Sequence, residues 1–204
     1  MRARALGLFL LLGVGCAREG ATPGAYDVSA RESLRIPGGK RCLGLLSQLG
    51  IEHEALRTRS GMQTPVRVTG DIGGVSYTQG GKPSLVCDCR LALALHWAAP
   101  VLRSWHITRI EHFGAYSNRT TRRGRPSLHA LGLALDAARF EFPDQSVSVA
   151  RSYARGWGDG CSSAAPAVNR VVCGLRNLRL FRELITPDHD ADHRDHVHLA
   201  IAPR

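Results

Sequence analysis

Apolar residues recur at helical spacing in three parts of the chain. The first part, which begins just after Arg41, places four apolar residues on one helical face: Cys42, Leu45, Leu46 and Leu49. Gly50 follows this face, and glycine is the residue that most often ends a helix. We therefore expect a short helix at the start of the folded domain.

The most regular helical pattern begins at Asp88 and continues to about Leu102. Its apolar stripe consists of Leu91, Leu95, Ala98 and Leu102. Pro100 lies near the end of this stripe, where the helix is expected to finish. A third helix is expected over about residues 163–176.

Alternating apolar and polar residues predict strands in three other segments. Residues 65–81 alternate on both sides of a glycine-rich turn, which predicts a hairpin. Residues 106–117 and 196–201 alternate in the same way. The order of these elements lacks regular βαβ alternation, so we expect an α+β domain with a mainly antiparallel sheet flanked by helices.

The N-terminal residues differ in character from the rest of the chain. A basic start is followed by an apolar run too short to span a bilayer and then by Cys16, so residues 1–16 are expected to be an export signal. The residues before Cys16 resemble a bacterial lipoprotein cleavage box, and both lipidation of Cys16 and ordinary cleavage stay open. Residues 17–38 are polar and without periodicity, which predicts a tether. The domain is then expected over residues 39–204, in the periplasm or cell envelope.

Export implies an oxidising compartment, so the remaining cysteines are expected to form disulfides rather than a thiolate metal site. These cysteines are Cys42, Cys87, Cys89, Cys161 and Cys173. An odd number leaves one unpaired. We expect Cys161 to pair with Cys173, and Cys42 to pair with either Cys87 or Cys89.

The formal net charge of +10 favours an anionic partner. An exported chain without a nucleic-acid recognition motif is expected to meet peptidoglycan or another anionic envelope polymer, and the membrane through a lipid anchor if Cys16 is modified. Nucleic acid is not expected as a partner, and we expect a monomer. The alternative is that the charge is spread evenly and only keeps the protein soluble.

A histidine and an aspartate stand seven residues apart in the segment SLHALGLALD. In one continuous helix His129 and Asp136 would lie about 10.5 Å apart along the axis, which is too far to share an ion. If instead Gly132 makes a turn and residues 133–137 form a strand, the two ends fold back towards each other. That geometry permits a shared ligand.

The C-terminal segment HRDHVHLAI supplies two more imidazoles. In a strand His196 and His198 share one face, while Val197 and Leu199 pack inward and the imidazoles face a cleft. One carboxylate and two imidazoles suit a single Zn²⁺ and leave a fourth position open for water. Such a metal acidifies its water and polarises a carbonyl.

Four segments in this order resemble the bacterial extensin-like C-terminal domain family: CRLALALHWAAPVL, RIEHFGAYSNR, SLHALGLALDAARF and HRDHVHLA. The S-x-H-x-x-G-x-A-x-D pattern with a later H-x-H also resembles the wider zinc-peptidase group of lysostaphin-type endopeptidases, D-Ala-D-Ala peptidases and the hedgehog domain. The resemblance implies a hedgehog/DD-peptidase-like fold. It covers about residues 41–200.

The resemblance also implies roles for individual residues. His129, Asp136 and His198 match the zinc ligands, and His196 would contact the substrate or the developing oxyanion. The general base would be His193 or Asp192.

Two further residues match substrate-binding positions of the wider group. Arg119 would hold a peptide carboxylate by paired hydrogen bonds, and Ser127 stands two residues before the first ligand. The alternative for Arg119 is simple surface charge, because the surrounding run RTTRRGR is rich in arginine. The family often has cysteines where this chain has Asn118 and, roughly, Met62, so we expect a different disulfide set.

The function expected from this resemblance is that of a zinc metallopeptidase cleaving an amide bond in peptidoglycan stem peptides, by carboxypeptidase or endopeptidase geometry. A second hypothesis is a catalytically inactive, metal-containing wall-binding module. A third is a metal-free structural envelope protein, which would require His129 and His198 to lie far apart.

Overall fold

The computed structural model describes residues 35–157 and 161–203. The expected export signal, Cys16 and most of the expected tether lie outside these residues. The helices are α1 (Gly39–Gln48), α2 (Cys89–Ser104), α3 (Val149–Ser152) and α4 (Ala167–Asn177). The strands are β1 (His53–Ala55), β2 (Pro65–Val68), β3 (Ser76–Gln79), β4 (Lys82–Pro83), β5 (Leu85–Asp88), β6 (Arg109–His112), β7 (Ala134–Glu141), β8 (Ser146–Ser148), β9 (Glu183–Ile185) and β10 (Val197–Ala200).

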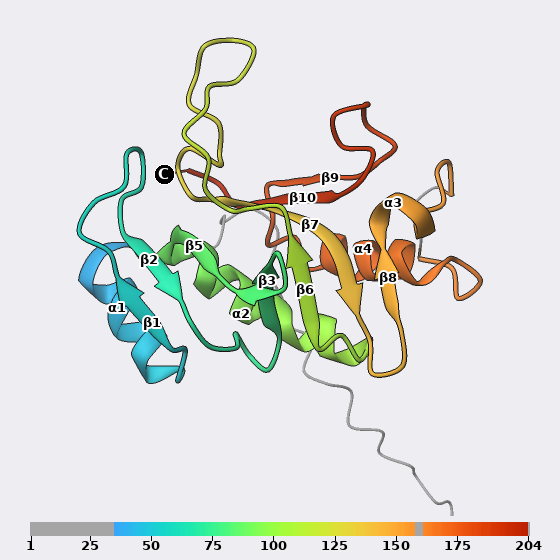
Figure 1. Ribbon diagram of the computed structural model, residues 1–204, viewed down its shortest axis with the longest axis horizontal. Helices are drawn as coiled ribbons and strands as arrows, with labels where there is room; N and C mark the ends of the chain where they lie inside the picture. The colour runs from blue at the N-terminus through green and yellow to red at the C-terminus, as the bar shows by residue number, and fades with distance from the viewer. Residues whose placement is uncertain (1–34, 158–160, 204) are drawn as a thin grey trace, which may run out of the picture. The chain divides into compact units, whose positions relative to one another are not determined.

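The strands form two sheets, as Figure 1 shows. The smaller sheet has the order β1-β2-β5, and the larger has the order β4-β3-β6-β7-β10-β9 with β8 paired to β7. Only β3 and β6 pair in parallel; the other pairs among the described residues are antiparallel. The expected α+β class with a mainly antiparallel sheet is therefore confirmed.

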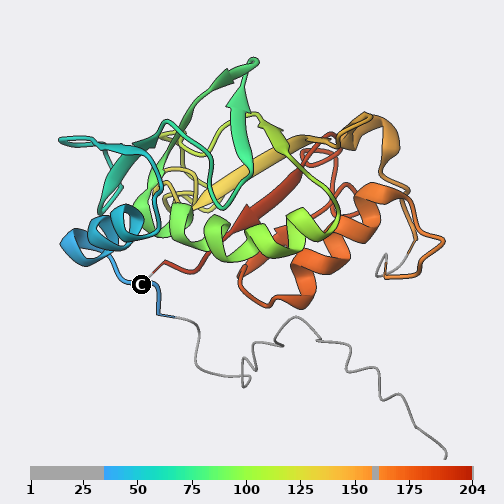
Figure 2. The ribbon, with the colours of Figure 1, turned by 90° about the horizontal axis from the view of Figure 1, so that it is seen from below.

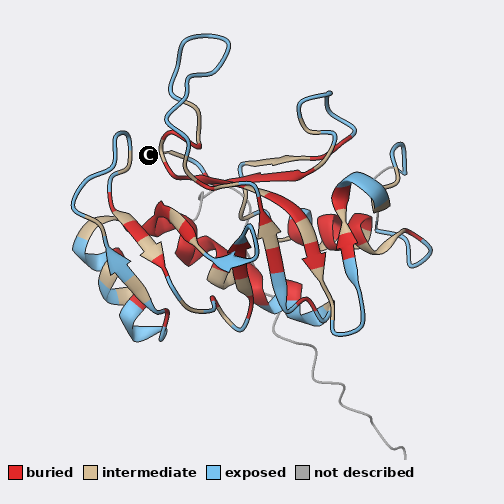
Figure 3. Cartoon of the chain, viewed as in Figure 1, coloured by how far each residue is buried: buried red, intermediate tan, exposed pale blue. Residues whose placement is uncertain are grey.

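Helices α1, α2 and α4 form a layer beneath the strands, which is clearest in Figure 2. Helix α2 is buried almost all round over residues 89–95, because it packs between α1, α4 and the sheets. The core consists mainly of α2 together with the central strands β6, β7 and β10. In Figure 3, β10 is red throughout and β6 and β7 are red in part. Within the described part of the chain, none of these three helices lies on the other face of the large sheet (Figure 2).

The expected hairpin over residues 65–81 is wrong. Its first half, β2, pairs with β1 and β5, whereas its second half, β3, pairs with β4 and β6 in the other sheet. The glycine-rich turn does form, closed by a bridge between Ile72 and Val75. Alternation identifies a half-buried strand but not its partner, so the pattern could not show that the chain changes sheets here.

The three expected helices are present with shifted ends. Helix α4 begins at Ala167 rather than at 163, because Pro166 occupies its N-cap and disfavours helical backbone in the residue before it. Gly50 has a positive φ of 67° just after α1, as expected of a terminating glycine. Ile36 lies in the core, so the packed domain begins before residue 39.

Two disulfides stabilise the helical layer. Cys42 pairs with Cys89, which joins α1 to the first residue of α2, and Cys161 pairs with Cys173 in α4. Cys87 is buried and is the free cysteine of the described residues. Disulfides of this kind are typical of oxidising, extracellular compartments. None of the described helices has the length and apolar character needed to cross a membrane.

Candidate metal centre

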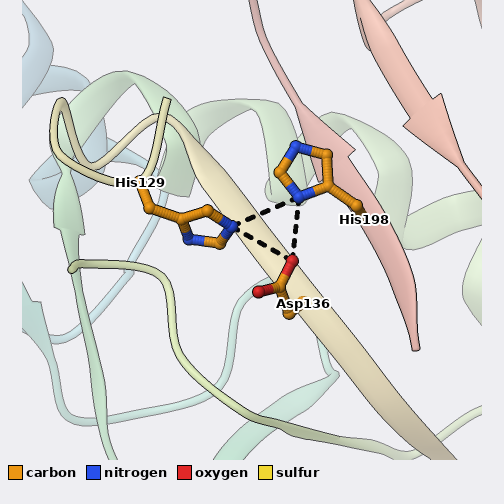
Figure 4. Close-up of side chains that lie close together, drawn as sticks. All are labelled: His129, Asp136 and His198. Carbon is orange, nitrogen blue, oxygen red and sulfur yellow. Dashed lines mark hydrogen bonds and ion pairs between the residues drawn. The ribbon is translucent and has the colours of Figure 1, made fainter. Parts of the chain in front are cut away.

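Asp136 and His198 are brought together by the pairing of two central strands. In the antiparallel pair β7–β10 they stand directly opposite each other, so their side chains project from the same face. His198 Nδ1 lies 2.8 Å from Asp136 Oδ1. Figure 4 shows this contact, with Asp136 on β7 and His198 on β10.

His129 reaches the same point from a single helical turn just before β7. The Ser127 hydroxyl accepts the backbone N–H of Ala130 at the start of this turn. At its end Leu133 N–H donates to Leu128 O and Gly132 N–H donates to His129 O, which is the hydrogen-bond pattern that terminates helices at a left-handed glycine. Gly132 has a φ of 65°. Of the two alternatives for this segment, the structure has the glycine turn followed by a strand, β7, which begins at Ala134.

The ligand atoms of these three residues converge on one point. His129 Nε2 lies 3.1 Å from Asp136 Oδ1 and 3.2 Å from His198 Nδ1 (Figure 4). All three atoms lie within 4.8 Å of one another. Donors bound tetrahedrally to one zinc ion, each about 2.0–2.1 Å from it, would be about 3.3 Å apart. The nitrogen and oxygen donor set and its spacing therefore fit a single zinc ion.

The electrostatics of the cluster also suit a cation. Burial would raise the pKa of Asp136, but hydrogen bonds from His129 and His198 outweigh it and hold this pKa far below its usual range. The carboxylate is therefore anionic. Burial lowers the pKa of His198 despite its contact with Asp136, which favours the neutral imidazole that a metal requires.

His196 lies beside the three ligands with its ring held between two carboxylates. Its Nδ1 is 2.8 Å from Asp195 Oδ1, and its Nε2 is 3.4 Å from Asp136 Oδ1. Phe113 packs edge-on against the same ring at 5.8 Å. His196 and His198 are both buried. Strand β9 pairs with β10 next to His198.

The two candidates for the general base occupy different surroundings. His193 lies with its ring centre 5.2 Å from that of His196 and 5.8 Å from that of His198, and its Nδ1 is 2.6 Å from Asp190 Oδ1. Asp192, in contrast, is largely exposed and forms an ion pair with Arg122 at 2.8 Å. The fold thus brings His193 to the cluster and leaves Asp192 on the outside of the loop.

Arg119 and Ser127 lie on facing segments of the long loop before β7. The backbone N–H of Ser127 donates to Arg119 O. The Arg119 guanidinium reaches within 3.9 Å of Asp136 Oδ2 while remaining more than half exposed. The Ser127 hydroxyl is occupied in the turn that carries His129, so its observed role is structural.

Three carboxylates at the site were not assigned from the sequence. Asp190 and Asp195 each face the Nδ1 of a histidine, and Glu183 Oε2 on β9 lies 3.7 Å from His198 Nε2. The i, i+3 spacing of Asp190 and His193 was a usable signal. No sequence signal points to Glu183, because its proximity to His198 depends on the pairing of β9 with β10.

Replacing Glu183 by glutamine should weaken zinc binding about tenfold, because carboxylates behind ligating histidines typically contribute this much to metal affinity. The measurement is competitive zinc titration with a chromogenic chelator. Glu54→Gln, on exposed β1, is the matched control and should leave the affinity unchanged. Equal affinities for all three proteins would exclude this role for Glu183.

Gly132→Ala should destabilise the fold by about 2–3 kcal/mol, from left-handed backbone strain and a steric clash. An added Cβ would lie 2.6 Å from Asp88 N and 2.9 Å from Met62 Sδ. Gly124→Ala is the control, since Gly124 has a similar φ of 73° but open space around it. Urea unfolding of both variants separates backbone strain from the steric clash. Equal losses in the free energy of unfolding would show that the clash contributes nothing.

Comparison with known families agrees with the order of motifs along the chain. The family model for the extensin-like protein C-terminus matches residues 40–204, which include every helix and strand described above except the first residue of α1. No curated protein and no solved structure matches the chain. With nearly the whole folded domain matched, the chain belongs to the extensin-like protein C-terminus family.

Proposed function

We propose that this domain is an exported zinc-dependent hydrolase, with a hedgehog/DD-peptidase-like fold, that cleaves an amide bond in peptidoglycan stem peptides. The observation that carries the proposal is the convergence of His129, Asp136 and His198, which come from a turn and two strands, on one point. Two further histidines lie beside that point. A site that served only to hold the fold together would have no need of them.

Zinc would be held by His129 Nε2, Asp136 and His198 Nδ1, and when bound it would lower the pKa of a water molecule and polarise a carbonyl group. Among the described residues the cluster offers three protein ligands rather than four. A three-ligand site with an open position is the arrangement found in catalytic zinc centres, whereas structural sites are usually closed by a fourth protein ligand.

His193 is the proposed general base. Its Nδ1 faces Asp190, which also accepts the backbone N–H of His193, so the carboxylate fixes both the position and the tautomer of the ring. The Nε2 atom is then the one left to accept a proton from the attacking water. The same atom can return that proton to the leaving amine when the C–N bond breaks.

His196 and Arg119 are proposed to act on the substrate. The Nδ1 of His196 donates to Asp195, so Nε2 can also donate only when both ring nitrogens carry a proton. In that imidazolium form His196 can stabilise the oxygen on which negative charge develops during attack. Arg119, exposed and close to Asp136, can hold a peptide carboxylate by two parallel hydrogen bonds. The two disulfides and the basic charge are consistent with a partner in the cell envelope.

The test is digestion of purified peptidoglycan by residues 35–204, with zinc or with EDTA, and mass spectrometry of the fragments. We expect new peptide termini that require zinc and disappear in His129→Ala. His106→Ala is the matched control, because His106 is exposed and stands outside the cluster. The termini would also distinguish carboxypeptidase from endopeptidase cleavage.

The second hypothesis, an inactive wall-binding module, gives a different result in the same experiment. It predicts about one equivalent of tightly bound zinc and sedimentation of the protein with peptidoglycan, but no new termini at any zinc concentration. Zinc binding by His129→Ala equal to that of the wild type would remove the basis of both hypotheses.

A further inference from the structure

A groove of about 670 Å³ lies on the open face of the large sheet. Its floor is formed by β6, β7 and β8, and α3 contributes one wall. The groove lining includes Phe113 and Asp195, two of the residues that contact the ring of His196. The groove therefore adjoins the candidate metal centre. Its volume lies within the range of ligand-binding clefts.

A β-bulge places this groove and the metal ligands on the same face of the sheet. Glu111 pairs with Arg139, but the next residue of β6, His112, pairs with Ala137, so Ala138 is an extra residue in β7. In a regular strand Asp136 and Arg139 would point to opposite faces. With the bulge both are partly exposed, while Ala137, Ala138 and Phe140 are buried.

The charged side chains of the groove differ in whether they already have partners. Its carboxylates are engaged: Glu111 accepts from Thr78 and Gly81, Glu141 accepts from Ser146, and Asp195 faces His196. The guanidinium groups are less engaged. Arg139 donates to Ser146, and within residues 35–157 and 161–203 the guanidinium groups of Arg109 and Arg151 make no hydrogen bond or ion pair. The groups left to bind a ligand are therefore cationic.

We propose that this groove binds the carboxylate-bearing part of an acidic peptide, with Arg109 and Arg151 as the recognising residues. The proposal rests on the proposed function, since it makes the groove the extension of that active site. It names the substrate class as a peptide with free side-chain or terminal carboxylates. A long polyanion fits less well, because the lining holds as many carboxylates as guanidinium groups and so offers no continuous positive surface, whereas one or two peptide carboxylates can pair locally with the arginines.

The test uses a synthetic wall-stem pentapeptide with a free glutamate and a free C-terminal carboxylate, and a twin in which both are amidated. Binding is measured by calorimetry in EDTA, so that metal-dependent cleavage does not interfere. The acidic peptide should bind more tightly than its twin, and Arg109→Gln with Arg151→Gln should weaken its binding about tenfold and remove the difference. Arg41→Gln with Arg103→Gln makes the same change of charge at exposed sites outside the groove and should have no effect.

The outcomes separate the groove from the metal chemistry. Tighter binding of the acidic peptide that depends on Arg109 and Arg151 supports the groove even if no cleavage occurs with zinc, in which case the proposed function fails alone. If both peptides are cleaved with zinc at the same KM, and Arg109→Gln with Arg151→Gln does not change this KM, the groove proposal is wrong and the proposed hydrolase function stands. If Arg41→Gln with Arg103→Gln weakens binding of the acidic peptide as much as the groove variant does, the effect is a long-range effect of net charge. That result also contradicts the groove proposal.

Discussion

Asp136→Asn is expected to abolish the zinc-dependent stabilisation and the hydrolytic activity that we propose for this protein. Under this proposal free zinc at about a thousand times its Kd should stabilise the wild type by about 4 kcal/mol, because only the folded state would bring the three ligands together. The variant loses the anionic donor at which the two imidazoles converge, so its gain should be below about 1 kcal/mol. Urea unfolding with zinc and with EDTA measures both gains.

Asp144→Asn is the control for this experiment, because Asp144 is exposed in the turn between β7 and β8. It should gain as much stability from zinc as the wild type. In EDTA the Asp136→Asn variant should still fold, since the hydrophobic core does not depend on the cluster. A zinc-dependent gain as large as that of the wild type would show that Asp136 is not a ligand.

Asp88→Ala should destabilise the protein by about 3–5 kcal/mol, a large part of the stability of an ordinary domain. The Asp88 side chain is fully buried and accepts two backbone N–H groups, those of Gln63 and Thr64, at 2.9 Å each. It also accepts the backbone N–H of Arg90 and the Arg90 Nε–H at 2.7 Å, which caps α2. Truncation leaves a buried guanidinium without its counter-ion.

A second variant separates the lost ion pair from the lost cap. Asp88→Ala combined with Arg90→Met removes the orphaned charge and should recover part of the stability, while the loss of the N-cap, about 1 kcal/mol, remains. Urea unfolding midpoints give both values, with Asp144→Ala as the exposed control. A double variant no more stable than Asp88→Ala would show that the charge is not the cause.

The helices were predictable because the signal for each one is local. The stripe of α2, the glycine after α1 and the disulfide between Cys161 and Cys173 all depend on residues close together in the chain. The sequence does not distinguish Cys87 from Cys89 as the partner of Cys42. The structure selects Cys89, because Cys87 on β5 is directed into the core.

The sheets were less predictable because strand pairing is not local. The pattern of β2 and β3 shows that each is half-buried, but their assignment to different sheets depends on competition between partners far apart in sequence. No pattern in the amino-acid sequence predicts the β-bulge at Ala138 either. The bulge brings Asp136 to the same face of the sheet as the groove.

The sequence by itself determined the donor chemistry of the candidate site and the turn that makes it possible. Two imidazoles and a carboxylate are set by residue type, and the return of His129 towards Asp136 follows from Gly132. Only the tertiary structure decided how the supporting groups are placed. It sets the carboxylate of Asp190 against the ring of His193 and that of Glu183 near His198, and it directs Asp192 away from the cluster towards Arg122. The reason is physical, because these contacts depend on loop conformation and strand register, which the whole fold sets.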